Sequence, residues 1–283
     1  MNEPRGVVAW LLGVVGIIAA CSPCVGDPCS WSGTLLGPTG PSTGTTPAVE
    51  LTIYAAASLQ EVLSAIEIAY EAAEPGVTLT LATDTSGTLR MQIEQGAPAD
   101  LFLSADQRNP DDLVEAGLTD GPAVDFAGNA LVIVVPHDNP GQVSSPLDLA
   151  RPGLKIVGAG DRVPITTYAT EAVSKLAALA GYPDDFTNRY AANIVSMEDN
   201  VGAVMAKIEL GEGDAAIVYR TDAMHASRVT VIELPEAAAV TATYSGVVVG
   251  ASRQRATAHA FLDWLAGRDG SAILTEFGFL PPP

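Results

Sequence analysis

The sequence predicts an α/β protein with two lobes. Strand-like runs of apolar and β-branched residues alternate with runs whose apolar residues recur at helical spacing, a pattern typical of helices packed on a parallel sheet. The chain has 283 residues, of which 48% are hydrophobic and 17% charged, and this composition suits a globular protein with a full core. Roughly 230 residues follow the N-terminal segment, so we expect two lobes with a ligand cleft at the carboxyl ends of the strands.

The first half of the folded part shows the alternation most clearly. Residues 51–57 have the composition of a buried strand, and apolar residues at helical spacing follow from Leu59 to Ala73, where Pro75 and Gly76 end the helix. Further elements expected here are strands at 77–82, 100–104 and 131–135, a helix at 88–95, and a helix whose first turn contains Pro110.

The second half continues this alternation. We expect strands at 155–158, 215–219, 229–234 and 241–249, and helices at 168–180, 199–210, 256–266 and 271–277. If the chain crosses between lobes near 129–135 and again near 244–249, the terminal helices return to the first lobe. The predicted first lobe then comprises residues 50–130 and 245–283, and the second comprises residues 131–244.

The N-terminus carries an export signal. Arg5 precedes an apolar run of about 14 residues that ends in Ala19-Ala20-Cys21, which is short for a membrane span and right for the core of a secretory signal peptide at residues 1–20. Small residues leading into a cysteine resemble the lipobox of bacterial lipoproteins, which implies that Cys21 is lipidated and becomes the mature N-terminus. The alternative is a transmembrane anchor with an incidental Cys21. Both interpretations predict an exported chain tethered to the cell membrane, facing the periplasm or the cell exterior.

Residues 21–49 are predicted to be a flexible tether. Residues 30–49 are rich in Gly, Pro, Ser and Thr, as flexible spacers are. Cys21 and Cys24 have the spacing of a C-x-x-C pair, but no second pair completes a metal site. Cys24 and Cys29 could form a local disulfide in an oxidising compartment, and the sequence leaves that question open.

The charge balance argues against nucleic-acid partners. Lys and Arg number 14 against 33 Asp and Glu, which gives a net charge of −19, whereas a nucleic-acid binder shows a basic stripe. A small anionic ligand is also repelled at long range. Salt screens exposed charges beyond roughly 8 Å, however, so a closed cleft lined by neutral donors can still bind an anion at contact.

Two hydroxyl-bearing stretches lie where a strand gives way to a helix. They are residues 55–59, which contain Ser58, and residues 83–88, which contain Ser86. The first backbone N–H groups of a helix have no partner within it and carry the positive end of the helix dipole, so two such ends facing each other form a cradle for a small oxyanion. Each serine also has an ordinary interpretation as a helix cap, with Ser58 and Glu61 forming a capping box.

Several motifs together resemble one known family. They are residues 54–59, 86–89, 163–164 with 168–169, 198–200, 213–223 and 277–282, and above all the long stretch Gln92–Gln107. These segments look like those of the periplasmic molybdate-binding proteins of ABC uptake systems. The resemblance spans roughly residues 50–283. It implies a type II periplasmic-binding-protein-like fold with the ligand cleft between its lobes.

The resemblance also implies a set of binding residues. The family holds its oxyanion with two serines, two backbone amides of the second lobe and a tyrosine hydroxyl, without a cationic side chain or direct ligation of the metal. By motif these positions fall on Ser58, Ser86, the amides of Ile165 and Asn200, and Tyr219.

This chain departs from the family pattern at two places. Residues 165–167 are Ile-Thr-Thr where the family usually has small residues, and Asn200 replaces an apolar residue. Backbone donors tolerate such changes of side chain. Asp84 lies only two residues before Ser86, and because a carboxylate aimed inward would repel a dianion, we expect it to face solvent.

Three functions are compatible with the sequence. The first is a tethered receptor, without enzymatic activity or cofactor, that captures molybdate or tungstate and delivers it to a membrane permease with its ATPase. The second is a receptor of the same fold for another small anion such as sulfate, or for a small organic acid. The third is an exported hydrolase with Ser58 or Ser86 as nucleophile and His225 as base, although the sequence supplies no third group to orient the base.

Overall fold

The computed structural model describes residues 49–282. The predicted signal peptide, the lipidation of Cys21, the tether and the possible Cys24–Cys29 pair lie outside the described residues. The strands are β1 (Val49–Ala56), β2 (Val77–Asp84), β3 (Leu101–Ser104), β4 (Val124–Pro136), β5 (Ile156–Ala159), β6 (Ile194–Glu198), β7 (Ala216–Tyr219), β8 (Val229–Glu233) and β9 (Thr241–Val248).

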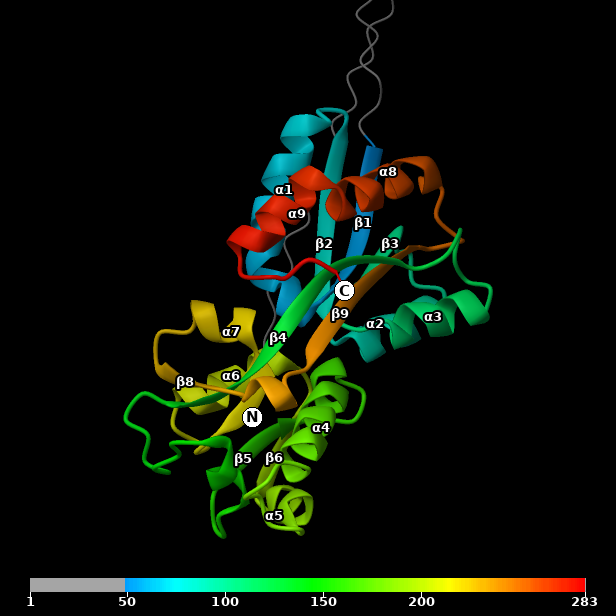
Figure 1. Cartoon of the computed structure of the whole chain (residues 1–283). Coiled ribbons are helices and arrows are strands. Elements are labelled where there is room, and N and C mark those ends of the chain that lie inside the picture. The colour runs from blue at the N-terminus through cyan, green and yellow to red at the C-terminus, as the bar shows by residue number, and fades with distance from the viewer. Residues whose placement is uncertain (1–48, 283) are drawn as a thin grey trace, which may run out of the picture. The chain divides into compact units, whose positions relative to one another are not determined.

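Helices surround the strands (Figure 1). They are α1 (Gln60–Ala73), α2 (Ser86–Glu94), α3 (Arg108–Glu115), α4 (Pro164–Ala177), α5 (Phe186–Ala192), α6 (Val201–Glu209), α7 (Arg220–His225), α8 (Arg255–Ala266) and α9 (Arg268–Glu276), with short 3-10 turns at Ala57–Leu59 (η1), Pro146–Ala150 (η2) and Glu236–Ala238 (η3). Within residues 49–282, no helix combines the length and the apolar character needed to cross a bilayer.

The main sheet is mixed rather than parallel. Its strand order is β2-β1-β3-β9-β4-β7, and β8 also pairs with β4. β1 is parallel to β2 and β3, but β9 is antiparallel to β3 and β4. The prediction of a parallel sheet is therefore correct for the first three strands and wrong for the whole, because β7, β8 and β9 each pair antiparallel with β4.

The long strand β4 belongs to both ends of the sheet. Residues Val124–Ala130 pair with β9, and the following residues pair with β7 and β8. In Figure 1, β4 and β9 run side by side from the region of α1, α8 and α9 to the region of α4 and α6. Gly128 lies in the first part, where it exchanges backbone hydrogen bonds with Leu280 and where a Cβ atom would lie 2.9 Å from the carbonyl of Pro281.

The terminal helices pack on the same end of the sheet as α1. Tyr70 of α1 meets Phe261 and Trp264 of α8 edge-on, with ring centroids 4.8 and 5.0 Å apart. Tyr70 and Phe261 are almost fully buried, and aromatic pairs of this geometry stabilise a core beyond the area they bury. The C-terminal helices therefore complete a core begun by the first strands.

Three elements were not predicted. They are α5, the edge strand β6 and the short helix α7, which begins directly at the end of β7. Within the described residues the strand β6 pairs with β5 alone, and its burial alternates between half-buried and exposed positions, so it lacks the apolar run that identified the other strands. The helix α4 also begins at Pro164 rather than Tyr168, since a proline fits the first turn of a helix.

Candidate functional site

Six segments far apart in the sequence converge on one small cavity. Its lining residues are Ala56, Ala57, Ser58, Thr85, Ser86, Ala105, Val163, Pro164, Asn200, Val201 and Tyr219. The cavity volume is about 10 Å³, roughly the space that one water needs by the same measure. Four of the five predicted binding residues, all except Ile165, therefore lie around a single small space.

Ser58 is hydrogen-bonded to a tyrosine and does not cap a helix. It lies inside η1, at 8% exposure, and its Oγ accepts a hydrogen bond of 2.8 Å from the hydroxyl of Tyr244. The N-cap of η1 is Ala56, and that of α1 is Leu59. The predicted capping box is wrong, because the 3-10 turn places Ser58 within the helical segment instead of before it.

Ser86 is likewise not a cap. It is the first residue of α2, and Thr85 occupies the N-cap position. The side chain of Ser86 is fully buried, and its Oγ accepts a 3.1 Å hydrogen bond from the backbone N–H of Ala105. The serine therefore connects the start of α2 to the end of β3.

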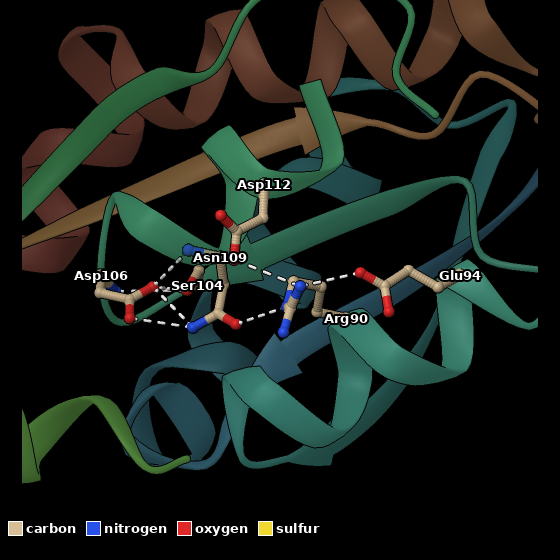
Figure 2. Close-up of polar contacts among 6 residues, drawn as sticks. All are labelled: Arg90, Glu94, Ser104, Asp106, Asn109 and Asp112. Carbon is tan, nitrogen blue, oxygen red and sulfur yellow. Dashed lines mark hydrogen bonds and ion pairs between the residues drawn. The ribbon is translucent and has the colours of Figure 1, made fainter. Parts of the chain in front are cut away.

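The turn that carries Ala105 is fixed by a polar network, which Figure 2 shows. Asp106 accepts hydrogen bonds from the hydroxyl of Ser104 at 2.8 Å and from the side-chain amide of Asn109 at 2.9 Å. The Nε of Arg90 donates to Asn109 at 3.0 Å, and Arg90 also pairs with one carboxylate of α2 and one of α3. This network ties α2 to the turn after β3.

Tyr219 ends β7 with its hydroxyl unpaired. The residue is 1% exposed, and among residues 49–282 its hydroxyl has no hydrogen-bond partner. The rings of Tyr244 and Tyr168 lie 5.7 and 6.4 Å away. Burial, together with these neighbouring phenols, raises the pKa of Tyr219 well above its ordinary value. Its hydroxyl therefore keeps its proton and remains a donor.

Two helix starts also line the cavity. The helix α4 begins at Pro164, and α6 begins at Val201 with Asn200 as its N-cap. The side chain of Asn200 accepts a 2.9 Å hydrogen bond from the backbone N–H of Ala203. Its departure from the family's apolar residue is therefore explained by capping.

Ile165 does not line the cavity. It follows Pro164 in α4, and its buried side chain lines a separate cavity beside Ala169 and Ile217. Only its backbone amide, in the first turn of α4, remains as a candidate donor. That role stays a prediction.

Asp84 lies outside the small cavity. Its Oδ1 accepts a 2.7 Å hydrogen bond from the backbone N–H of Thr85, and the half-buried residue borders a cleft of about 560 Å³ that Asp161, Arg162 and Asp199 also line. Asp84 therefore borders this larger cleft and does not line the small cavity with Ser86.

Ser58 and His225 both border a cleft of about 220 Å³, but within residues 49–282 they form no hydrogen bond of a hydrolase site. The Nδ1 of His225 lies 2.9 Å from the carbonyl of Thr221, and its ring stacks on Phe277. Within the described residues, the partner of Ser58 is Tyr244 and that of Ser86 is Ala105, so neither serine bonds to a histidine. The same part of the chain contains no group of three or more His, Cys, Asp or Glu residues suited to a metal ion.

The partners of the two serines could not be found from the sequence. Tyr244 lies 186 residues from Ser58, and Asn129, which also contacts Tyr244, lies 115 residues from it. No spacing rule connects residues so distant. Tyr244 resembles any other buried aromatic residue of a strand in its local sequence.

Comparisons with known proteins identify the family. The family described as "Bacterial extracellular solute-binding protein" matches residues 51–280. The chain belongs to this family. The solute-binding protein is 35% identical over 278 residues to the molybdate-binding protein ModA of Mycobacterium tuberculosis, covering 98% of this chain and 97% of that one. It is also 32% identical over 242 residues to YvgL of Bacillus subtilis, provisionally named an ABC transporter substrate-binding lipoprotein, covering 84% and 89%.

A solved structure supports the same fold. The periplasmic molybdate-binding protein of Azotobacter vinelandii superimposes on the solute-binding protein with a TM-score of 0.70 at 22% identity, covering 82% of this chain and 100% of that one. The predicted two-lobed type II fold class is confirmed, and so is the resemblance that the motifs indicated.

Proposed function

We propose that this solute-binding protein captures molybdate or tungstate outside the cytoplasm and delivers it to an ABC permease with its ATPase. The observation that carries the proposal is the buried hydroxyl of Tyr219, which has no partner within residues 49–282 and lines the same cavity as Ser58 and Ser86. A buried polar group without a partner is destabilising, and an oxyanion that widens this cavity beyond its present one-water volume would accept its hydrogen bond.

Neutral donors suit a dianion that must bind and leave. A hydrogen bond to a charged group contributes about 1.5–3 kcal/mol, so six or seven of them reach the roughly −12 kcal/mol of nanomolar binding. Among residues 49–282, no lysine or arginine lines the cavity. A site built this way leaves no uncompensated buried charge when it is empty.

The proposed binding set is the one predicted from the motifs. The hydroxyls of Ser58, Ser86 and Tyr219 and the backbone amides of Ile165 and Asn200 hold the oxyanion, and no residue ligates the metal directly. The protein needs no cofactor and catalyses no reaction. Its relatives named for molybdate binding support this reading.

We further propose that the lobes divide as predicted, with residues 50–130 and 245–283 in one and 131–244 in the other. The dual pairing of β4, first with β9 and then with β7 and β8, supports a crossing within that strand. The chain is exported, and a lipid on Cys21 tethers it to the cell membrane. Metabolic labelling with a fatty-acid analogue tests the tether, and a Cys21→Ala variant that still takes up label contradicts it.

A competition series tests the choice of ligand. Thermal unfolding is followed with molybdate, tungstate, sulfate and phosphate, and with a small carboxylate such as acetate. The proposal predicts a large rise in Tm with molybdate and tungstate and a much smaller one with the others. A larger rise with sulfate or the carboxylate would instead support a receptor for another anion, and no rise with any of them would contradict anion binding.

A further inference from the structure

The two cavity serines already accept hydrogen bonds from the protein itself. A serine hydroxyl has one proton to donate and two lone pairs that accept. The Oγ of Ser58 accepts from the Tyr244 hydroxyl at 2.8 Å, and that of Ser86 accepts from the Ala105 N–H at 3.1 Å. In each case a donor of the protein bonds to a lone pair of the serine oxygen, and no hydrogen bond within residues 49–282 uses the serine's own proton.

Asn129 supports the direction of the hydrogen bond from Tyr244 to Ser58. The side-chain amide of Asn129 donates to the hydroxyl of Thr221 at 2.9 Å and to the hydroxyl of Tyr244 at 3.4 Å. Because an amide N–H group can only donate, the oxygen of Tyr244 accepts there, and the Tyr244 hydroxyl donates its own proton to Ser58. Asn129 and Tyr244 are both fully buried, so water does not compete for these bonds.

A comparable arrangement holds Ser86. Its donor, Ala105, lies in the turn between β3 and α3 that Asp106 fixes through Ser104 and Asn109 (Figure 2). A backbone N–H cannot reverse its direction. Ser86 is therefore an acceptor on the protein side whatever the state of the cavity, whereas Ser58 depends on a hydroxyl that can rotate.

We propose that Tyr244 is a positioning residue of the binding site, which sets Ser58 as a hydrogen-bond donor toward the cavity. The inference rests on the proposed function and adds to it a residue outside the predicted binding set. The Tyr244 hydroxyl occupies the acceptor side of Ser58, so the serine proton is available for an oxyanion. Chains of hydrogen bonds also polarise one another at low dielectric, which strengthens the terminal donor.

A double-mutant cycle tests the role of Tyr244. Calorimetric titration with molybdate compares the wild type, Tyr244→Phe, Ser58→Ala and the double variant. We expect Tyr244→Phe to bind about tenfold more weakly, in line with one weakened charge-assisted hydrogen bond, and to cause no further loss when Ser58 is already alanine. A purely structural role would lower affinity equally in both backgrounds. Equal losses, or an unchanged affinity of Tyr244→Phe, would overturn the inference.

Two further variants complete the test. Tyr70→Phe removes the hydroxyl of another buried tyrosine, which packs against α8 away from the cavity, and it should bind as the wild type does. If Tyr244→Phe fails to fold, Asn129→Leu removes the donor behind Tyr244 and should weaken binding about threefold, and an unchanged affinity overturns the inference. A wild type that binds no oxyanion contradicts the proposed function itself, and the inference with it.

Discussion

The three hydroxyls that meet at the cavity fall into two kinds. Ser58 and Ser86, from η1 and the start of α2, each accept a hydrogen bond from the protein. The hydroxyl of Tyr219, at the end of β7, makes no hydrogen bond to any residue between 49 and 282. The two serine hydroxyls, called the serine side below, are thus hydrogen-bonded within the folded protein. The Tyr219 hydroxyl can find a partner only in a molecule bound in the cavity.

This difference separates stability from binding. Removing a serine hydroxyl leaves its buried donor without a partner, which costs about 1–3 kcal/mol. Removing the tyrosine hydroxyl takes away a group that is already unsatisfied, so the free energy of unfolding should not fall. Serine and tyrosine variants should therefore all weaken binding, but only the serine variants should lower the free energy of unfolding.

The largest effect is expected when the start of α4 is moved away from Ser86. A Cβ atom on Gly87 would lie 2.6 Å from the carbonyl oxygen of Arg162, two residues before α4. Gly87→Ala should push the start of α4 away from Ser86 and weaken molybdate binding by at least about a hundredfold, because two charge-assisted hydrogen bonds amount to roughly 3–6 kcal/mol. Gly76→Ala, where a Cβ meets nothing within 4 Å, is the matched control. If calorimetry gives equal molybdate affinities for the two variants, the start of α4 need not lie close to Ser86 for binding.

Ser86→Ala should affect both properties. The variant loses one donor to the oxyanion, which weakens binding by about tenfold or more, and it leaves the buried N–H of Ala105 unpaired. Urea unfolding without ligand should show a loss of about 1–3 kcal/mol. An unchanged free energy of unfolding would mean that the serine side is not part of the folded framework.

Tyr219→Phe should affect binding alone. Its hydroxyl has no partner to lose within the described part of the chain, so the free energy of unfolding should stay the same or rise by about 1 kcal/mol. Molybdate affinity should fall about tenfold or more. A variant that is clearly less stable in urea would contradict the distinction between the two sides.

The smallest effect on binding is expected at Asp222, whose influence is on stability. Burial raises the pKa of Asp222 to about 8, and the nearby Glu61 adds to the rise, although the backbone N–H of Tyr219 opposes it. The folded state therefore holds a proton that the unfolded state has released. Stability from this group is present below about pH 4 and is lost as the pH rises through about 8.

The Asp222→Asn variant sharpens that prediction. Asparagine keeps the size of the side chain but cannot ionise, so the fall in unfolding free energy between pH 5 and pH 9 should become shallower. Urea unfolding at several pH values measures the slope. Identical slopes for the wild type and the variant would show that Asp222 does not titrate as its burial implies.

The positions of most strands were predicted well from the sequence. Strands such as β1 and β7 are apolar runs with clear ends, so their positions differ from the prediction by one or two residues. The beginning of β4 was missed because Gly128 and Asn129 interrupt its apolar run. Gly128 is needed there because the chain end packs against it, a long-range contact without a local signal.

The candidate site was predicted only in part. Family motifs placed Ser58, Ser86, Asn200 and Tyr219, and the structure brings all four to one cavity. Local patterns, in contrast, suggested helix caps for the two serines, and both caps are wrong. The reason is physical: the partners of the serines come from the turn after β3 and from β9, and only the folded sheet brings these segments together.

Diffraction from crystals grown with tungstate tests the central claim most directly. Tungsten scatters anomalously, so its position is found without assuming where the ligand binds. The account predicts a single strong peak in the cavity, with oxygens of the anion within hydrogen-bond distance of the hydroxyls of Ser58, Ser86 and Tyr219. A peak elsewhere in the protein, or a tungstate whose oxygens do not reach the Tyr219 hydroxyl, would contradict it.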